Sequence, residues 1–480
     1  MRDPGALALG RTKHLHFVGI GGIGMSGIAE LVANLGYRVS GSDARRTELT
    51  DRLSTLGIDM RVGHDAANIG DADVVVVSSA VAADNPEVVA ARTRHVPVIP
   101  RAEMLAELMR LRTGIAIAGA HGKTTTTSMV ALMLERAGLD PTAVIGGRLS
   151  AFGSNARLGR GPYMVAEADE SDRSFLMLSP TIAVITNLDR EHMESYGSFD
   201  RLVDAFVEFA GRVPFYGAVV ACVDDPAVAA LLPRLSRPVI TYGFATAADV
   251  RGEAPSTDGA SARCNVVYRD RAAGGRTAQG ELRLRVPGEH NLLNALAAVA
   301  VGLEAGVPFD RIVSALADFR GAERRYQLRG DARGVTVIDD YGHHPTEIAA
   351  VLKAARAGRP SRLVAVFQPH RYSRTRDLMD EFGPALALAD LVVLTDIYAA
   401  GETPMPGVTL DALAQAIGRR VPALHVVRDL ADVPAAIARL AQPGDLLITL
   451  GAGSIGGVGD QILTALAGAT PAGAAAGGPR

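Results

Sequence analysis

Apolar and polar positions follow one another in a pattern that predicts strands alternating with helices along most of the chain. Short runs of apolar, often β-branched residues indicate buried strands, and stretches with apolar residues three and four positions apart indicate helices. Strands that alternate with helices are typical of parallel sheets with helices on both faces. The predicted fold class is therefore α/β. The strands are expected at residues 14–18, 37–43, 73–80, 114–118, 163–167, 182–186, 335–340, 362–367, 391–395 and 445–450.

The length of 480 residues predicts about three domains, each with room for its own core. We expect them at 1–112, 113–325 and 326–468. The first and third are expected to be Rossmann-like, and the second to be a P-loop ATPase-like domain that binds a mononucleotide. Residues 469–480, mostly Ala, Gly and Pro without periodicity, are expected to be a disordered tail.

Composition narrows the possible partners. A net charge of −3 disfavours nucleic acid as a bulk electrostatic partner. The two cysteines, Cys222 and Cys264, cannot make a disulfide framework and lack the spacing of metal ligands. No stretch reaches the roughly 18 apolar residues needed to span a bilayer, and the N-terminus has no signal-peptide hydrophobic region. We expect a cytoplasmic protein that binds no membrane, as a monomer or a homodimer.

One lysine of the chain stands in a glycine-rich loop. Only three lysines occur, and Lys123 lies in GAHGKTTTT at 119–127, between a predicted strand and a predicted helix. A compact ammonium fits between phosphate oxygens where a planar guanidinium does not. Backbone N–H groups and the helix N-terminus would converge on the same anion. The sequence therefore predicts a phosphate-binding loop.

The loop is shorter than the usual P-loop motif, because position 117 is Ile where that motif has Gly. A glycine turn that binds nothing remains an alternative. The hydroxyls that follow Lys123 favour the phosphate site, since Thr124 is placed to bind a Mg²⁺ that bridges two phosphates.

A second glycine-rich loop, GIGGIGMSG at 19–27, lies between the strand at 14–18 and a helical pattern. Its spacing fits G-x-G-x-x-G, and the next strand ends at Asp43, so the motif alone predicts NAD with Asp43 on a ribose. The glycines by themselves indicate only that a diphosphate approaches the backbone. The strand at 73–80 ends in small polar residues at the edge of the sheet where ligands of such folds bind.

Acidic residues follow the strand that begins at Tyr163, in the segment EADESD at 167–172. Such a density of negative charge favours a bound cation, with Glu167 as the best ligand. Asp169, Glu170 and Asp172 could equally be solvated loop acids. His192, after the next core strand, is favoured as a ligand or phosphate contact over a structural histidine.

Seven motifs together resemble those of the Mur ligase family, over about residues 14–460. They are GIGGIGMS at 19–26, GAHGKTTTT at 119–127, EADESD at 167–172, TNLDREHM at 186–193, GEHNLLNALAA at 288–298, DDYGHHPTEI at 339–348 and QPHRYSRTRD at 368–377. The resemblance is strongest to the members that use ATP and Mg²⁺ (or Mn²⁺) to join L-alanine to UDP-N-acetylmuramate. It implies that the first glycine loop holds the UDP diphosphate rather than a dinucleotide.

The resemblance also implies roles for individual residues. The ATP site would comprise Gly119, Ala120, His121, Gly122, Lys123, Thr124, Thr125, Asn291, Arg325 and Asp340. The UDP-sugar site would comprise Gly19, Gly21, Gly22, Gly24, Met25, Ser26, Asp43, Ser78 and Ser79. The metal ligands would be Thr124, Glu167 and His192, and the alanine side Tyr341, His343, Arg371 and Arg374.

Several assignments keep an alternative. Lys123, Glu167, His192 and His343 are the predicted catalytic residues, but His343 could orient the substrate rather than take a proton. Asn294 could be only a helix-packing amide, and Arg324 only a surface neighbour of Arg325. Arg376 is expected to be a solvated charge, and Arg371 and Arg374 are expected in a loop.

Three other functions compete with this interpretation. An NAD-dependent dehydrogenase explains the loop at 19–27 but gives Lys123 no role. A nucleotide-regulated binding module without ligase activity does not explain the arginine and histidine residues of the third domain. A related ligase that recycles a whole peptide onto the same acceptor sugar is the nearest rival.

Overall fold

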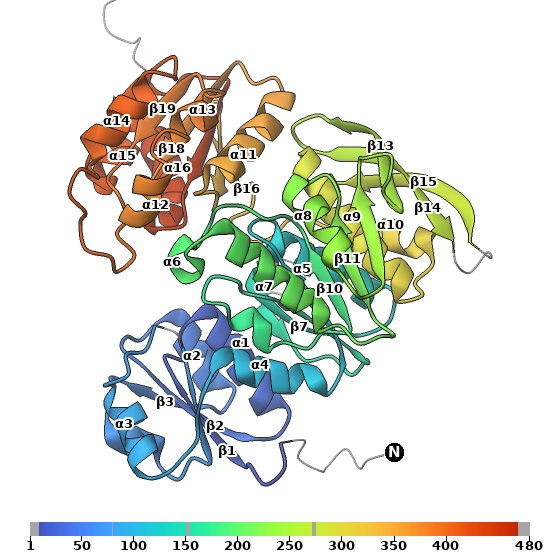
Figure 1. Cartoon of the computed structure of the whole chain (residues 1–480). Coiled ribbons are helices and arrows are strands. Elements are labelled where there is room, and N and C mark those ends of the chain that lie inside the picture. Colours follow the sequence, from blue (N-terminus) through green and yellow to red (C-terminus); the bar gives the residue numbers. More distant parts are fainter. Residues whose placement is uncertain (1–8, 79, 150–153, 271–274, 469–480) are drawn as a thin grey trace, which may run out of the picture. The chain divides into compact units, whose positions relative to one another are not determined.

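The computed structural model describes residues 9–78, 80–149, 154–270 and 275–468, and these form three sheets (Figure 1). The chain divides into two compact units. The first comprises Met1–Pro255, Arg263–Leu284 and Asn291–Ala322, and the second comprises Ser256–Ala262, Arg285–His290 and Glu323–Arg480. The first unit contains two of the sheets, and the second contains the third. The tail predicted at 469–480 lies outside the described residues.

The N-terminal sheet is parallel and has the order β3-β2-β1-β4-β5. Its strands are β1 His14–Val18, β2 Arg38–Asp43, β3 Asp59–Val62, β4 Val74–Val77 and β5 Val98–Pro100, and its helices are α1 Ile23–Asn34, α2 Glu48–Thr55, η1 Ala66–Ile69, α3 Pro86–Thr93 and α4 Arg101–Arg110. Every residue of β1 is buried. This is the Rossmann-like arrangement expected from the sequence, although β4 is shorter than the predicted strand at 73–80.

The central sheet has ten described strands in the order β15-β14-β13-β12-β11-β10-β6-β9-β7-β8. They are β6 Thr113–Ala118, β7 Thr142–Leu149, β8 Ser154–Arg157, β9 Tyr163–Glu167, β10 Ile182–Ile185, β11 Ala218–Cys222, β12 Val239–Gly243, β13 Val250–Thr257, β14 Ala262–Asp270 and β15 Arg276–Leu284. The neighbours from β7 to β13 pair in parallel, whereas β7 and β8 pair antiparallel. The predicted strands β6, β9 and β10 lie next to one another in the middle of this sheet.

Helices lie between and after these strands along the chain. They are α5 Lys123–Arg136, η2 Ser174–Met177, α6 Met193–Tyr196, α7 Phe199–Gly211, α8 Pro226–Leu231, η3 Leu232–Arg234, α9 Glu289–Glu304 and α10 Phe309–Ala317. Of these helices, α9 begins in a stretch that belongs to the second unit. Residues 129–134 of α5 form an apolar run and are all buried. Among the described helices, none combines the length and hydropathy that a membrane crossing requires.

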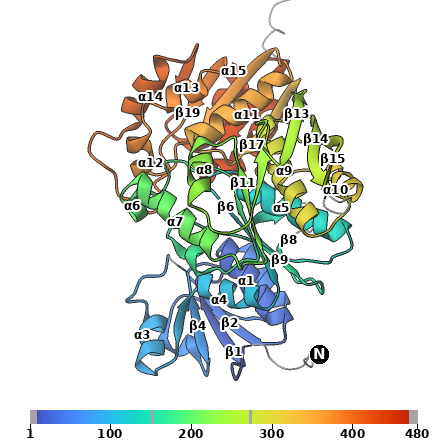
Figure 2. The ribbon, with the colours of Figure 1, turned by 45° about the vertical axis from the view of Figure 1, so that its right-hand side comes forward.

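The second unit contains a six-stranded sheet of order β16-β17-β21-β18-β19-β20, drawn in orange to red in Figures 1 and 2. Its strands are β16 Gln327–Ala332, β17 Val335–Asp340, β18 Arg362–Phe367, β19 Leu391–Leu394, β20 Leu424–Val426 and β21 Asp445–Leu450. All pairs are parallel except β16 with β17. The helices are α11 Pro345–Ala357, α12 Tyr372–Asp377, α13 Phe382–Leu386, α14 Leu410–Gly418, η4 Leu430–Asp432, α15 Val433–Leu440, η5 Ser454–Gly457 and α16 Val458–Gly468.

Two apolar clusters cover the two faces of this third sheet. Ile348 of α11 and Phe382 of α13 pack in one cluster with Phe367 of β18. Ile437 of α15 and Ile462 of α16 pack in the other cluster, with Val337 of β17. A doubly wound sheet therefore confirms the α/β class for this part of the chain.

Candidate active site

The loop between β6 and α5 has a backbone that only glycine accommodates. Gly119 has φ 137° and Gly122 has φ 81°, both in the left-handed region. A Cβ at Gly119 would overlap the Thr186 hydroxyl, and one at Gly122 would lie 2.5 Å from Asn294 Oδ1. The loop delivers the N-terminus of α5 at Lys123, where unpaired N–H groups favour an anion. This geometry supports the predicted phosphate loop and disfavours a simple turn.

Residues that follow β10 hold the phosphate loop from one side. The side chain of Asn187 accepts from His121 N at 2.7 Å and donates to His121 O at 3.0 Å. Thr186 Oγ1 donates to the same carbonyl at 2.7 Å, and His121 Nε2 lies 2.9 Å from Asp189 Oδ2. Sequence analysis gave Thr186 and Asn187 no role, although their position at the end of a core strand was a usable signal.

The Lys123 ammonium has three acceptors within the protein. Its Nζ donates to Gly119 O at 2.6 Å, Ala120 O at 3.1 Å and Glu170 Oε1 at 2.8 Å. Burial acts to lower the pKa of Lys123, but the charge and hydrogen bond of Glu170, together with the charges of Glu191 and Asp169, outweigh it and raise that pKa. Burial raises the pKa of Glu170 to about 7, against the opposing effect of Lys123. Glu170 is thus a buried partner of Lys123 and not a solvated loop acid.

Two of the predicted metal ligands lie next to each other. Thr124 Oγ1 donates to Glu167 Oε2 at 3.3 Å, and the other carboxylate oxygen of Glu167 accepts from Gly146 N at 2.6 Å. Glu167 ends β9 and Thr124 is in the first turn of α5, so neighbouring β6 and β9 bring them together. A hydroxyl beside a carboxylate is a donor set that suits Mg²⁺.

The third predicted ligand, His192, belongs to a neighbouring group. One ligand atom each from Glu170, Glu191 and His192 lies within 4.8 Å of the others. His192 has the left-handed φ of 56°, which turns the chain sharply before α6. The second oxygen of Glu170 is buried without a hydrogen-bond partner among the described residues. Two carboxylates with an imidazole fit a Mg²⁺ or Mn²⁺ ion.

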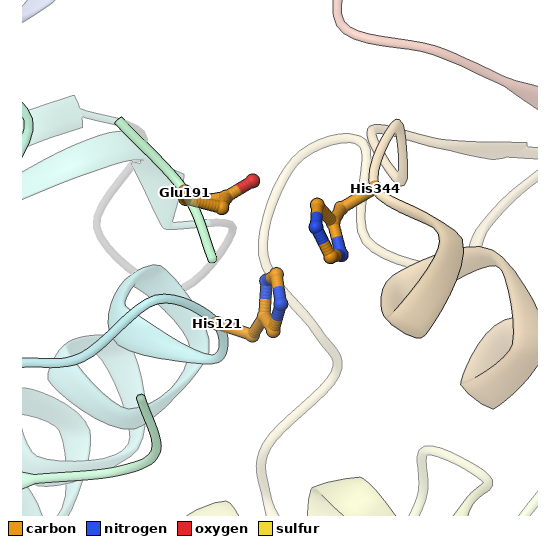
Figure 3. A group of neighbouring side chains, drawn as sticks. All are labelled: His121, Glu191 and His344. Carbon is orange, nitrogen blue, oxygen red and sulfur yellow. The ribbon is translucent and has the colours of Figure 1, made fainter. Parts of the chain in front are cut away.

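Glu191 was missed by the sequence analysis. Its side chain lies near that of His121 in the phosphate loop, with ligand atoms within 4.8 Å (Figure 3). The third residue drawn there, His344, belongs to the other unit, where it caps α11. Asp172 is exposed, in keeping with a solvated acid.

Two asparagines of α9 lie near the phosphate loop. Asn294 Oδ1 accepts from Thr126 Oγ1 at 3.2 Å, and Asn294 Nδ2 lies 3.4 Å from Asn291 Oδ1. Both side chains are buried. Because Asn294 also lies over Gly122, its amide does more than pack a helix: it fixes the entry of α5.

The glycine loop of the N-terminal sheet is held by the end of β2. Gly19 N and Ile20 N both donate to Ser42 O, at 2.9 and 3.0 Å. Gly21 N donates to Asp43 Oδ2 at 2.9 Å, and a Cβ at Gly21 would lie 2.8 Å from that oxygen. Asp43 therefore fixes the shape of the loop in the structure.

The remaining predicted residues of this loop differ in exposure. Met25 and Ser26 are buried within α1, whereas Gly22 is its exposed N-cap. The Arg101 guanidinium lies against Gly24 and also donates to Asp169 Oδ2 at 3.3 Å, a contact that the sequence did not indicate. Ser78 directly follows β4, and Ser79 lies outside the described residues.

In the second unit, Asp340 ends β17 with both carboxylate oxygens in use. They accept from Tyr326 N and Gly342 N, each at 2.7 Å. Burial raises the pKa of Asp340 to about 6. The guanidinium of Arg325 lies over the Tyr341 ring at 5.1 Å, and its charge acts on Asp340. The predicted residues Arg325, Asp340 and Tyr341 therefore lie together.

Arg324 is not a surface neighbour of Arg325. Its Nε donates to the buried Asp339 at 3.0 Å and its Nη2 donates to Gly451 O at 2.6 Å. Its side chain is only 22% exposed and also stacks over Tyr341. Arg324 therefore ties β17 to the loop that follows β21.

His343, His370 and Arg374 form a second group in this unit. The His343 ring lies edge-on to His370 at 5.5 Å, and Arg374 Nη1 lies 3.3 Å from His370 Nδ1. Burial, with His343 and Arg374 nearby, lowers the pKa of His370 to about 3, so this ring is neutral at working pH.

Of the two predicted alanine-side arginines, Arg371 lies in a loop as expected, whereas Arg374 does not. Arg371 is the N-cap of α12 with φ 71°, and Arg374 lies inside that helix. The expectation failed for Arg374 because the helix has only six residues, too few for a clear helical pattern in the sequence. Arg376 is exposed and pairs with Asp377 at 2.7 Å, which agrees with a solvated charge.

Comparisons with known proteins match nearly the whole chain. Residues 14–113 match the profile described as Mur ligase family, catalytic domain. Residues 117–302 match the Mur ligase middle domain, and residues 324–453 match the Mur ligase, glutamate ligase domain. The chain belongs to the Mur ligase family, as the resemblance of its seven sequence motifs indicated.

Individual relatives are similar over most of their length. The UDP-N-acetylmuramate--L-alanine ligase of Syntrophotalea carbinolica is 53% identical over 94% of this chain and 98% of the relative. That of Acidobacterium capsulatum is 54% identical over 96% and 99%. Among solved structures, the UDP-N-acetylmuramate-alanine ligase of Thermotoga maritima is 32% identical with a TM-score of 0.79, over 95% of this chain and 99% of that one.

Proposed function

We propose that this protein joins L-alanine to the carboxylate of UDP-N-acetylmuramate, with cleavage of ATP, in the synthesis of peptidoglycan precursors. The observation that carries the proposal is the identity of 53% over 94% of the chain with a ligase of that name. The phosphate loop with Lys123 beside a group of acids is the structural support. We place the reaction in the cytoplasm, where ATP and nucleotide sugars are available.

The reaction needs activation of the acceptor carboxylate. A carboxylate is a poor electrophile and its oxygen is a poor leaving group, so ATP first converts it into an acyl phosphate. The amine of L-alanine then attacks the acyl carbon, and phosphate leaves. Lys123 offsets the negative charge that develops on the transferred phosphoryl group, while the N-terminus of α5 orients its oxygens.

The acids of the first unit would hold a divalent cation. We assign Thr124 and Glu167 to one position, and His192 with Glu170 and Glu191 to an adjacent one. Mg²⁺ or Mn²⁺ bound there would neutralise phosphate charge and act as a Lewis acid.

The other substrates would use the remaining loops. We assign the UDP diphosphate to the loop at 19–24, where Gly22 opens α1 and leaves N–H groups for an anion. Asn291, Arg325 and Asp340 would contact the nucleotide. Tyr341, His343, Arg371 and Arg374 would hold L-alanine, with the arginines on its carboxylate.

A peptide-recycling ligase is the nearest alternative. The murein peptide ligase of Psychrobacter arcticus is 26% identical with a TM-score of 0.70, over 95% of this chain and 99% of that one. The alanine-adding ligase of Thermotoga maritima is more similar in both sequence identity and TM-score, and we therefore favour a free amino acid as the second substrate.

Phosphate release with a panel of UDP-sugars and amino acids tests the proposal. We expect release to require ATP, UDP-N-acetylmuramate and free L-alanine together. A Lys123→Ala variant serves as the inactive control and should lose about 10²-fold or more in turnover. Release with a tripeptide but not with L-alanine would favour the recycling ligase, and release with neither would reject both.

A further inference from the structure

Lys123 is saturated by acceptors of the protein itself. An ammonium has three N–H donors, and its acceptors are two loop carbonyls and the Glu170 carboxylate. The carbonyls belong to the same loop as Lys123, whereas Glu170 comes from the segment after β9. For Lys123 to bind a nucleotide phosphate, one acceptor must leave. Of the three acceptors, Glu170 is the one with a negative charge, and its carboxylate takes the place on Lys123 that a phosphate oxygen would take.

Besides Lys123, the Glu170 carboxylate has a second group of neighbours, Glu191 and His192. Its Oε1 is on Lys123, while its Oε2 is buried and has no hydrogen-bond partner among the described residues. The side chain is only 4% exposed, so water cannot readily compensate its charge once Lys123 is withdrawn. Glu191 and His192 bring ligand atoms to within 4.8 Å of the Glu170 carboxylate. A divalent cation bound by these three residues would therefore compensate the negative charge of Glu170.

We propose that Glu170 is a positioning residue that exchanges Lys123 for the divalent cation when ATP binds. Its carboxylate holds the ammonium over the phosphate loop, gives it up to the nucleotide phosphate, and then ligates the cation with Glu191 and His192. This proposal rests on the proposed function only in taking ATP as the ligand of the phosphate loop.

The exchange makes nucleotide and metal bind cooperatively. Without the cation, ATP must displace Glu170 and leave a buried carboxylate uncompensated, so it binds weakly. With the cation present, the displaced carboxylate has a partner, and each ligand strengthens the binding of the other by the same factor. Couplings of this kind are about 5-fold to 150-fold.

The test measures the dissociation constant of ATP by calorimetry, in EDTA and in saturating Mg²⁺, for the wild type and Glu170→Gln. The amide keeps the shape of the side chain and removes its charge. We expect Glu170→Gln to bind ATP at least about 5-fold more tightly than the wild type in EDTA, because no carboxylate competes for Lys123. The enhancement by Mg²⁺ should shrink by about the same factor.

Asp172→Asn is the matched control, since it removes a charge from the same acidic segment at an exposed position. It should leave both dissociation constants near the wild-type values. Glu170→Asp provides a second variant should the amide fail to fold, because its shorter side chain keeps the charge but falls short of Lys123. It too should tighten ATP binding in EDTA.

Weaker ATP binding in EDTA, or an unchanged Mg²⁺ enhancement in a folded variant, would overturn the exchange and leave Glu170 a structural partner of Lys123. This outcome is separable from failure of the proposed function. That failure would appear as a wild type that binds ATP but releases no phosphate with UDP-N-acetylmuramate and L-alanine.

Discussion

The Asn187 side chain bonds both backbone polar groups of His121. The amide oxygen accepts from the peptide N–H at 2.7 Å and the amide nitrogen donates to the carbonyl at 3.0 Å. A single side chain that follows β10 thus fixes one residue of the phosphate loop through both of its backbone polar groups. The loop shape depends on this contact as well as on its glycines.

Replacing Asn187 with Ala should weaken ATP binding. The part-buried His121 N–H would lose its partner, at about 1–3 kcal/mol if it stays unpaired, whereas the His121 carbonyl would keep the hydrogen bond from Thr186, so the loop would be held less firmly for phosphate. We expect the KM for ATP to rise about 10-fold while the KM for UDP-N-acetylmuramate changes little. Steady-state kinetics with each substrate varied in turn checks this, and equal rises in both constants would contradict a local role.

Gly21→Val should act on the other glycine loop. A Cβ at this position would lie 2.8 Å from Asp43 Oδ2, the oxygen that accepts from Gly21 N. The loop must shift, and the branched side chain also occupies space next to the backbone that the diphosphate would approach. We expect binding of UDP alone to fall about 10-fold or more, measured by calorimetry, with ATP binding preserved. Loss of both would indicate misfolding.

Arg374→Lys should separate alanine recognition from nucleotide binding. Lysine keeps the charge but loses the planar fork that binds a carboxylate through two N–H groups. The KM for L-alanine should rise about 10-fold, while those for ATP and UDP-N-acetylmuramate change little. Arg376→Lys in the same helix is the matched control, since Arg376 is exposed and pairs with Asp377. A rise in the ATP constant alone would assign Arg374 to the nucleotide.

His14 should make the N-terminal sheet sensitive to acid. Burial, together with Arg38, lowers its pKa from 6.5 to about 4. The unfolded chain therefore binds the proton first, so the free energy of unfolding falls as the pH drops from 6.5 towards 4 and levels off below. His14→Asn should lose less stability over that interval, as measured by thermal melting against pH. His95→Asn, at an exposed position, should keep the wild-type slope.

Local patterns predicted both glycine loops and most of the inner strands of each sheet, although the equally buried apolar strand β11 was missed. The strands β1, β6 and β10 are continuous apolar runs, and the glycines stand where a strand meets a helix, so neighbouring residues alone indicate the structure. The strand β15 was not predicted, because most of its residues are exposed or half-buried and several are charged. Its position depends on pairing rather than on an apolar run.

The candidate site was predicted only in part, for a related reason. Lys123 and Glu167 stand in recognisable motifs. Glu170, Glu191 and Arg101 acquire their contacts only when separate segments of the chain meet in the fold. Several acids in one segment look alike in sequence, and burial alone distinguishes Glu170 from Asp172.

The second unit draws on three separate stretches of the chain, and this limits how the protein can be divided. Besides Glu323–Arg480, it includes Ser256–Ala262 and Arg285–His290. Lys353 of α11 pairs with Glu289 at 2.7 Å, and the Tyr326 hydroxyl lies 3.4 Å from Gly259 O, so the short stretches bond to the long one. A fragment cut before Glu323 would lack these partners. Domain exchange between ligases of this architecture therefore requires grafting two internal loops as well as the C-terminal segment.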